Sequence, residues 1–308
     1  MLQPYIADLV GEGRSFEDVR SFIEGASRSS EPVIILGESG TGKEAAARSS
    51  HFGSRRKSHP FISIDAGLYY DRELERELFG CTGGGVTRKG LLEFASLGTC
   101  YISNVEQLSP HLQGRLEYFI QTGTVLRVGS NKPVSSKARL ITSSTKDVSG
   151  FTEGGLFSPD LFQSLSGQLL AIQPLRHRSE DVAPFVTRVA QSFSVETGRD
   201  PKSITFATDA LEALVAYPWP GNYDELKAEL LRVFQSGVVT VTKESLAPEI
   251  LHFSLGAERE SEVRAVIEEI EDMIQEFRIM VRLDAEYGDI LIDKADWDVK
   301  LKCYDRAV

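Results

Sequence analysis

Short apolar runs alternate with stretches of helical periodicity through the first half of the chain. Four of these runs have the length and composition of buried strands, at residues 33–36, 61–64, 99–102 and 138–142. Apolar residues at helical spacing lie between them, as in residues 112–122. This alternation predicts an α/β fold in which helices cover both faces of a parallel sheet.

The pattern changes near Leu175, after which strand candidates largely stop. Three later stretches have the apolar spacing of helices, at residues 180–194, 207–216 and 222–236. A chain of 308 residues is long enough for about two domains. We therefore expect three parts: an α/β domain over 1–176, a small helical domain over 177–255 and a C-terminal helical extension over 256–308.

The C-terminal extension carries most of the acidity of the chain. Residues 256–308 contain 15 acidic and 8 basic residues, a net charge of -7 out of -11 for the whole chain. This balance argues against direct DNA binding by the extension. Apolar residues in it repeat with spacings of 4, 3, 4, 3 and 4, at Val263, Ile267, Ile270, Ile274, Phe277 and Val281. Such a heptad seam indicates either a helix packed on its own domain or a helix for self-association.

The composition is that of a globular protein, with 41% hydrophobic and 26% charged residues. No apolar run approaches the ~20 residues that span a bilayer, and the N-terminus has no secretory pattern. The cysteines, Cys81, Cys100 and Cys303, are scattered, which excludes a disulfide framework and a cysteine zinc site. A cytoplasmic protein without a membrane segment or a metal site is therefore expected.

A glycine-rich segment follows the first strand candidate and precedes a helical stretch. Its residues fit the phosphate-binding pattern GxxxxGK in the context that the pattern requires: Gly37, Glu38, Ser39, Gly40, Thr41, Gly42 and Lys43. The glycines let backbone N–H groups turn toward phosphate oxygens, and the helix N-terminus adds partial positive charge. Lys43 is expected to reach the β- and γ-phosphates, whereas Glu44 stands where most such loops carry the Ser or Thr that touches Mg²⁺. The segment predicts bound ATP or ADP and gives little support for Mg²⁺.

Further motifs follow this loop in a fixed order. They are PF at 60–61, ELFG at 77–80, RVG at 127–129, PLRHRSED at 174–181 and YPWPGN at 217–222. Together with GESGTGKE at 37–44, they resemble the AAA+ domain of bacterial enhancer-binding proteins, the activators of sigma-54 RNA polymerase. The resemblance covers roughly residues 8–250. It implies an AAA+ α/β domain with a helical lid, a nucleotide at their junction, and ring oligomers.

The chain departs from this family at the positions that hydrolyse ATP. The family's Walker B strand ends in Asp-Glu, and the aligned residues here are Ser103 and Asn104. A serine brings no charge to a Mg²⁺ site, and an amide cannot take a proton from water. The family asparagine that couples nucleotide state to the loops aligns with Asp65. The resemblance therefore implies that general-base catalysis is lost at this place.

At four more positions the chain lacks the residue that the family uses in ATP hydrolysis. The two arginine fingers align with Ser158 and Ser164, and the sensor asparagine aligns with Thr145. The lid arginine that touches the γ-phosphate is replaced within Tyr223-Asp224, where Asp224 would repel phosphate. One arginine finger can be worth about 10³–10⁵ in rate. The set indicates a protein that does not hydrolyse ATP.

The segment that contacts sigma-54 in the family is also altered. The motif GAFTGA aligns with residues 84–89, where the aromatic is Val86 and the segment is shorter. Such a segment is poorly suited to engage sigma-54. The partners that we expect are proteins, either a second copy of the chain or an active AAA+ relative.

Three functional hypotheses remain open at this point. The first is a nucleotide-binding regulator that acts through protein contacts without hydrolysis. The second is an active ATPase in which Glu106 replaces the missing carboxylate, with Arg88, Arg127 or Arg176 as fingers; the ordinary interpretation of Glu106 is a solvated residue at a helix start. The third is an interaction module that binds no nucleotide. The remaining basic run, residues 55–57, is expected to be a solvated face of a loop.

Overall fold

The structure is a computed structural model that describes residues 11, 13–146, 157–198, 200 and 203–253. All of these residues belong to one compact unit. The heptad pattern of the C-terminal extension lies outside the described residues, so its helix stays a prediction.

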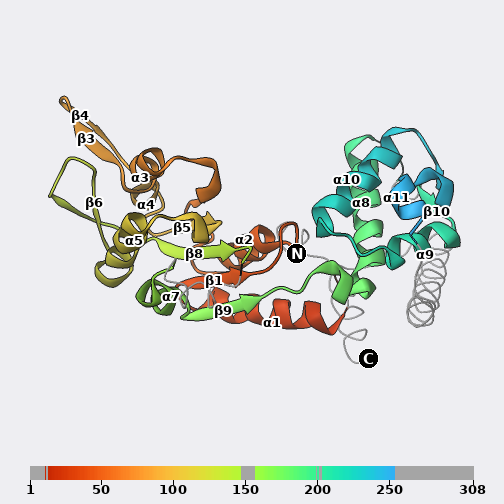
Figure 1. The fold of residues 1–308 in the computed structure, drawn as a ribbon, viewed down its shortest axis with the longest axis horizontal. Coiled ribbons are helices and arrows are strands. Elements are labelled where there is room, and N and C mark those ends of the chain that lie inside the picture. Colours follow the sequence, from red (N-terminus) through yellow and green to blue (C-terminus); the bar gives the residue numbers. More distant parts are fainter. Residues whose placement is uncertain (1–10, 12, 147–156, 199, 201–202, 254–308) are drawn as a thin grey trace, which may run out of the picture. The chain divides into compact units, whose positions relative to one another are not determined.

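Five parallel strands form the central sheet in the order β2–β5–β8–β1–β9 (Figure 1). Their bounds are β1 Val33–Leu36, β2 Phe61–Asp65, β5 Thr99–Ser103, β8 Arg139–Ser144 and β9 Gln168–Ala171. Every residue of β8 is buried, and so are three of the four in β1 and four of the five in β5. Burial on both faces explains why these strands read as apolar runs without alternation. The predicted α/β class with a parallel sheet is confirmed.

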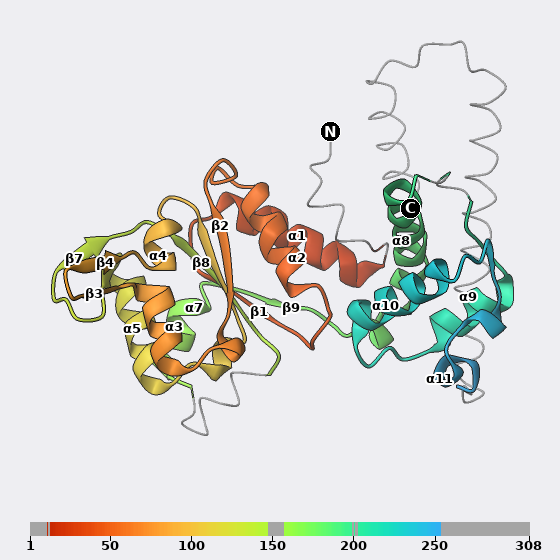
Figure 2. The same cartoon turned by 90° about the horizontal axis from the view of Figure 1, so that it is seen from above.

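Helices cover both faces of this sheet (Figure 2). One face carries α1 Arg14–Arg28 and α2 Lys43–Phe52, whose Val19, Ile23 and Ala46 join Ile35 of β1 in a buried core. The other face carries α3 Asp71–Phe79, α4 Leu91–Phe94, α5 Pro110–Thr122 and α7 Pro159–Leu165. Their apolar residues form a second core on Ile34, Cys100, Ile102 and Leu140. Alternate residues of each strand therefore face opposite layers.

Two short hairpins lie at the same end of the α/β part (Figure 1). The first joins β3 Cys81–Gly83 to β4 Val86–Arg88 through Gly84 and Gly85, which both have positive φ. A two-residue turn of this kind needs positive φ at both positions, which glycine adopts without strain. The second joins β6 Thr124–Leu126 to β7 Pro133–Ser135. The amide of Thr82 donates to the carbonyl of Val128 at 2.8 Å and ties the hairpins together.

The helical part follows β9 through 3₁₀ turns at Leu175–His177 and Ser179–Asp181. It contains α8 Val182–Glu196, α9 Thr208–Ala216, α10 Asn222–Gln235 and α11 Pro248–Leu251, with the short strands β10 Thr205–Phe206 and β11 Thr240–Val241 and a 3₁₀ turn at Lys243–Ser245. Trp219 is its largest fully buried side chain, and its indole N–H donates to the carbonyl of Leu214 at 2.7 Å. The helical stretches predicted at 180–194, 207–216 and 222–236 are therefore present as α8, α9 and α10.

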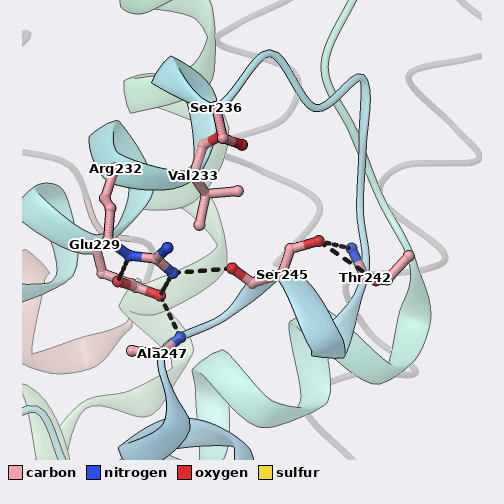
Figure 3. Close-up of polar contacts among 7 residues, drawn as sticks. All are labelled: Glu229, Arg232, Val233, Ser236, Thr242, Ser245 and Ala247. Carbon is pink, nitrogen blue, oxygen red and sulfur yellow. Dashed lines mark hydrogen bonds and ion pairs between the residues drawn. The ribbon is translucent and has the colours of Figure 1, made fainter.

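A polar cluster fixes the end of the helical part to α10 (Figure 3). Arg232 donates to both carboxylate oxygens of Glu229 at 2.7 Å and to the carbonyl of Ser245 at 2.9 Å. Glu229 also accepts the amide of Ala247 at 2.7 Å, just before α11. Because the Glu229 side chain is only 8% exposed, these bonds satisfy a carboxylate that solvent scarcely reaches.

The element bounds differ from the sequence expectations by one or two residues, except where an element was missed. Strand β8 begins at Arg139 rather than 138 and continues to Ser144 rather than 142. Strand β9 was missed because only Leu170 among its four residues is buried, as is typical of an edge strand. The hairpins were missed because three-residue strands carry too little periodicity to detect.

Candidate nucleotide site

The phosphate-binding loop connects β1 to α2 at the carboxyl edge of the sheet. Gly40 and Gly42 have φ of 74° and 94°, in the left-handed region that glycine favours. A Cβ atom on Gly40 would lie 2.2 Å from the carbonyl oxygen of Gly221, so no larger residue fits there without a shift of the backbone. The N–H groups in the first turn of α2 have no intrahelical partner and can bind an anion.

Lys43 begins α2 and turns back over this loop. Its ammonium Nζ donates to the carbonyl oxygens of Gly37 at 2.7 Å and Glu38 at 2.6 Å. Burial lowers the pKa of Lys43, and the carboxylates of Glu106, Asp224 and Glu38 act in the opposite direction. The ammonium is therefore a partly buried cation with three acids in its surroundings.

Glu38 ties the loop to the helical part through an ion pair with Arg176. The guanidinium donates to Oε2 at 2.8 Å and to Oε1 at 2.6 Å, a bidentate arrangement. Hydrogen bonding by Arg176 lowers the pKa of Glu38. The sequence identified Glu38 only as a loop residue. Its partner lies 138 residues further along, which leaves no local signal in the sequence.

Asn222, at the start of α10, makes the second link between the loop and the helical part. It is fully buried with φ of 54°, donates through Nδ2 to the carbonyl of Ser39 at 2.8 Å, and accepts the amide of Leu175 at 2.7 Å. The next amide, of Tyr223, donates to the carbonyl of Gly40 at 3.0 Å. The tip of the loop is thus held by backbone and side-chain bonds from α10.

The ends of β2 and β5 bring Asp65 and Asn104 into contact. The amide Nδ2 of Asn104 donates to Oδ1 of Asp65 at 2.7 Å, and the same oxygen accepts the amide of Gly67 at 2.8 Å. Ser103 ends β5 beside Asp65 in the strand register. In the family pattern the amide stands at the position of Asp65 and the acid at the position of Asn104. In this chain the acid ends β2 and the amide follows β5.

Glu106 lies in a 3₁₀ turn after β5 and contacts the end of β8. Its Oε1 accepts the hydroxyl of Thr145 at 2.7 Å and the amide of Thr145 at 3.2 Å. Its Oε2 is buried and has no hydrogen-bond partner among the residues that the structure describes. Only Oε2 departs from the expectation of a solvated residue, because both bonds to Oε1 lie at the surface. The turn position was right, because Glu106 is the acid in the first turn after Asn104.

The serines aligned with the family's arginine fingers have local structural positions. Ser158 caps α7 by accepting the amide of Leu161 at 3.2 Å, and its own amide donates to Gln113 at 2.7 Å. Ser164 lies within α7 and is half-buried. A capping serine is a common helix start and needs no functional explanation.

The arginines considered as substitute fingers are all paired. Arg88 lies 2.8 Å from Glu77, Arg127 lies 2.6 Å from Glu93, and Arg176 holds Glu38. Glu44 is exposed and pairs with Arg48 at 2.7 Å along α2. Asp224 is exposed in the first turn of α10, and its Cβ would lie 3.3 Å from a Cβ on Gly40. Asp224 thus borders the loop from the helical part, and Glu44 follows the loop directly in the first turn of α2.

Comparison with known proteins matches residues 9–171 to the sigma-54 interaction domain and residues 176–266 to an AAA+ ATPase lid domain. The chain belongs to the sigma-54 interaction domain family. The helical part corresponds to the lid of that family. Its contacts with the loop at residues 37–43 connect the α/β domain to the lid.

Relatives of this sigma-54 interaction domain protein are regulatory proteins by name, and HoxA is named a transcriptional one. The hydrogenase transcriptional regulatory protein HoxA of Cupriavidus necator is 36% identical over 206 residues, 65% of this chain and 42% of HoxA. The regulatory protein AtoC of Escherichia coli is 36% identical over 225 residues, 71% of this chain and 48% of AtoC. The chain thus spans less than half the length of these two relatives.

Solved structures of NtrX from Brucella abortus have the same fold. The complex of NtrX with ADP gives a TM-score of 0.74 at 27% identity and covers 87% of this chain and 63% of NtrX. The complex with ATP gives a TM-score of 0.74 at 26% identity, with coverages of 96% and 69%.

Two searches for other sites give negative results in the described part of the chain. No group of three or more His, Cys, Asp or Glu residues there is arranged to hold a metal ion. No helix within the same residues is long and apolar enough to cross a membrane.

Proposed function

We propose that this protein is a regulatory member of the sigma-54 interaction domain family that binds ATP or ADP but does not hydrolyse ATP. The observation that carries the proposal is the bond from the Asn104 amide to Asp65, at the place where the family holds its general base. An amide nitrogen that donates a hydrogen bond has no basic lone pair, so it cannot take a proton from water. Ser103 beside it adds no negative charge, and the acid that remains in the pair, Asp65, uses Oδ1 to accept the amides of Asn104 and Gly67.

Nucleotide binding is supported by the shape of the loop. Glycines at 40 and 42 adopt left-handed φ, the first turn of α2 presents N–H groups, and Lys43 is close by. The phosphates would be held by these groups, and Lys43 would exchange its bonds to the carbonyls of Gly37 and Glu38 for bonds to phosphate oxygens. The complexes of NtrX with ADP and ATP support the same ligand class.

The residues at the family's metal-holding positions do not supply carboxylates for a tightly held Mg²⁺ ion. Mg²⁺ favours carboxylate and phosphate oxygens. Ser103 offers only a hydroxyl, Asn104 is bonded to Asp65, and Glu44 faces solvent beside Arg48. We therefore propose binding that does not depend on Mg²⁺.

Regulation would proceed through protein contacts in a transcription-related process in the cytoplasm. The names of HoxA and AtoC support this setting. We propose domain limits of 1–176, 177–255 and 256–308, with the extension as the contact element for a second copy or an active AAA+ relative. The hairpin at 81–88 has two glycines at its tip and Val86 in place of the family's aromatic residue, which supports the view that it does not engage sigma-54.

Steady-state phosphate release and nucleotide titration test this proposal together. The purified full chain should release no phosphate above background with saturating ATP and Mg²⁺, yet should bind a fluorescent ATP or ADP analogue. Lys43→Ala should abolish that binding, whereas Lys132→Ala, at an exposed position in the second hairpin, should leave it intact. Phosphate release that Lys43→Ala eliminates would refute the loss of hydrolysis. Absence of binding by the unmodified chain would favour the module that binds no nucleotide.

A second candidate, the active ATPase with Glu106 as general base, is favoured by one observation. The Oε2 atom of Glu106 is buried and has no partner among the described residues, so it retains capacity to accept a proton. This candidate predicts measurable turnover that Glu106→Gln removes while nucleotide binding persists. Turnover that survives Glu106→Gln would exclude it.

A further inference from the structure

We propose that the site selects nucleoside diphosphates over triphosphates, and that the Glu106 carboxylate sets this preference. The inference rests on the proposed nucleotide binding and names the ligand that the site would favour. It concerns residues that lie around Lys43, beyond the backbone of the loop itself.

The sheet topology places Glu106 at the same edge of the sheet as the loop, with β8 between β5 and β1. Strands β5, β8 and β1 are adjacent and parallel, so their carboxyl ends lie side by side. Glu106 follows β5, Thr145 follows β8, and the loop follows β1. The backbone of such a loop holds the α- and β-phosphates, whereas a third phosphate depends on the lysine and on the charges near it.

The charges near Lys43 are unfavourable for a third phosphate. Each charged group that acts appreciably on Lys43 is an acid, with Glu106 first, then Asp224 and Glu38. Glu38 is neutralised by Arg176. Glu106 and Asp224 have no ion-pair partner closer than 4 Å within the described residues, and Lys43 is the cation on which both carboxylates act, so an incoming phosphate would compete with them for the same ammonium. Two like charges at close range in a partly buried site repel strongly.

The Glu106 carboxylate is held in place rather than free to turn away. Two bonds from Thr145, one from its amide and one from its hydroxyl, fix Oε1. The remaining oxygen Oε2 is buried, whereas the bonds to Oε1 lie at the surface, so water reaches only one side of the carboxylate. A movement of the carboxylate into solvent would break both bonds to Thr145. The contact between the turn after β5 and the end of β8 therefore fixes the position of the repelling carboxylate.

The variant Glu106→Gln separates the effect of the negative charge from the effect of the hydrogen bonds. Glu106→Gln keeps an acceptor oxygen for both bonds from Thr145 and removes only the negative charge. Glu73→Gln makes the same change at an exposed position in the first turn of α3 and is the matched control. Thr145→Val removes the hydroxyl donor and loosens the carboxylate without altering its charge.

The experiment titrates the full chain and each variant with fluorescent ADP and ATP analogues, with EDTA and then with Mg²⁺. We expect the unmodified chain and Glu73→Gln to bind ADP about tenfold more tightly than ATP, which corresponds to about 1.4 kcal/mol. Glu106→Gln should tighten ATP and reduce this ratio to about threefold or less, with ADP affinity within about twofold. Thr145→Val should give an intermediate ratio. Thermal unfolding without nucleotide confirms that each variant is folded.

Several outcomes would overturn the inference. Equal affinities for ADP and ATP in the unmodified chain would do so, and so would a ratio that Glu106→Gln leaves unchanged. A preference for ATP that appears with Mg²⁺ and disappears in Glu106→Gln would show that the carboxylate holds a metal ion instead of repelling phosphate. If neither nucleotide binds, the proposed function itself fails, which is a distinct result.

Discussion

Charged side chains have different surroundings at the two edges of the central sheet, the carboxyl edge where the strands end and the amino edge where they begin. At the carboxyl edge, Lys43, Glu106 and Asp224 lie close together, and Glu106 keeps an unpartnered oxygen. At the amino edge, Arg139 and His51 are almost fully buried, and their recorded bonds go to the backbone and to uncharged side chains. Unpartnered buried atoms occur at both edges, because Nη1 of Arg139 and Nε2 of His51 also lack a hydrogen-bond partner among the described residues. The edges differ in that a lysine and several carboxylates are gathered at the first, whereas the second bonds mainly to backbone and neutral groups.

At the amino edge, two arginines donate hydrogen bonds to neutral groups and not to carboxylates. Arg139 donates to the carbonyl of Glu31 at 3.0 Å and to the side chain of Gln168 at 3.4 Å. Burial lowers the pKa of Arg139 to about 10, and the nearby charge of Arg56 acts in the same direction. Arg56 donates to the carbonyls of Leu97, Gly98 and Lys137 at 2.8–3.1 Å. The expectation that residues 55–57 form a solvated face is therefore wrong for Arg56.

The contrast follows from how parallel strands are connected. Loops that leave the carboxyl ends pass over the sheet edge and bring residues from distant segments together, which is where ligands bind in α/β proteins. The amino ends receive chains that return from the helices, and their carbonyls need donors. Arginine supplies several donors from a single side chain, so it suits that need.

Arg139→Ala should have the largest effect on stability and tests the structural role of the amino edge. The variant removes a buried side chain and leaves acceptors unsatisfied, so we expect the free energy of unfolding to fall by about 3 kcal/mol. Nucleotide affinity should be unchanged because the residue lies at the opposite edge from the loop. Urea unfolding measures the first quantity and nucleotide titration the second.

Arg55→Ala, an exposed neighbour in the basic run, is the control and should change stability by no more than about 0.5 kcal/mol. Weakened nucleotide binding in folded Arg139→Ala would mean that the two edges are coupled, against the separation drawn above.

The pH dependence of stability should distinguish His51 from the other histidines. Burial lowers the pKa of His51, and the charges of Arg56, Arg139 and His59 act in the same direction, while a backbone bond at His59 opposes them. Since the folded pKa lies below the unfolded one, stability is fully present above the unfolded value near ~6.5 and is lost as pH falls through the folded value. Each unit of difference corresponds to about 1.4 kcal/mol.

Urea unfolding at pH 7.5 and pH 5 should therefore show a larger loss for the unmodified chain than for His51→Gln. His252→Gln, at an exposed position, should retain the full loss. Identical pH dependence in all three proteins would show that His51 is protonated as readily in the folded state as in the unfolded one.

The sequence allowed the fold class and most long elements to be predicted, because burial on both faces of β1, β5 and β8 leaves apolar runs. Helices α8, α9 and α10 were found by their period, and family motifs in order agree with the domain match. Edge strand β9 and the two hairpins were not found, because short or exposed strands leave weak patterns.

The candidate site could be predicted only in part. The loop from Gly37 to Lys43 is contiguous, so its spacing is visible in the sequence. The pairs Glu38–Arg176 and Glu106–Thr145 depend on which strands are neighbours, and the order β5–β8–β1 is not written in local periodicity. The burial of the Glu106 oxygen Oε2 depends on the same strand order. Local sequence gives no sign of that order, so Glu106 was expected in solvent.

Asp224→Asn should have the smallest effect and sharpens the contrast within the carboxyl edge. Asp224 is exposed, so solvent and salt screen its charge, whereas Oε2 of Glu106 is buried. We expect Asp224→Asn to improve ATP binding relative to ADP by about twofold at low ionic strength, and by less at 0.5 M salt. The effect of Glu106→Gln should persist at high salt.

Asp209→Asn, in the first turn of α9, makes the same charge change away from the loop and should leave the ratio unaltered. Titrations of both variants at two salt concentrations therefore separate a screened charge from a buried one. If Asp224→Asn proved as large and as salt-resistant as Glu106→Gln, the preference would come from the summed acidity of the edge, and burial of Oε2 would not explain it.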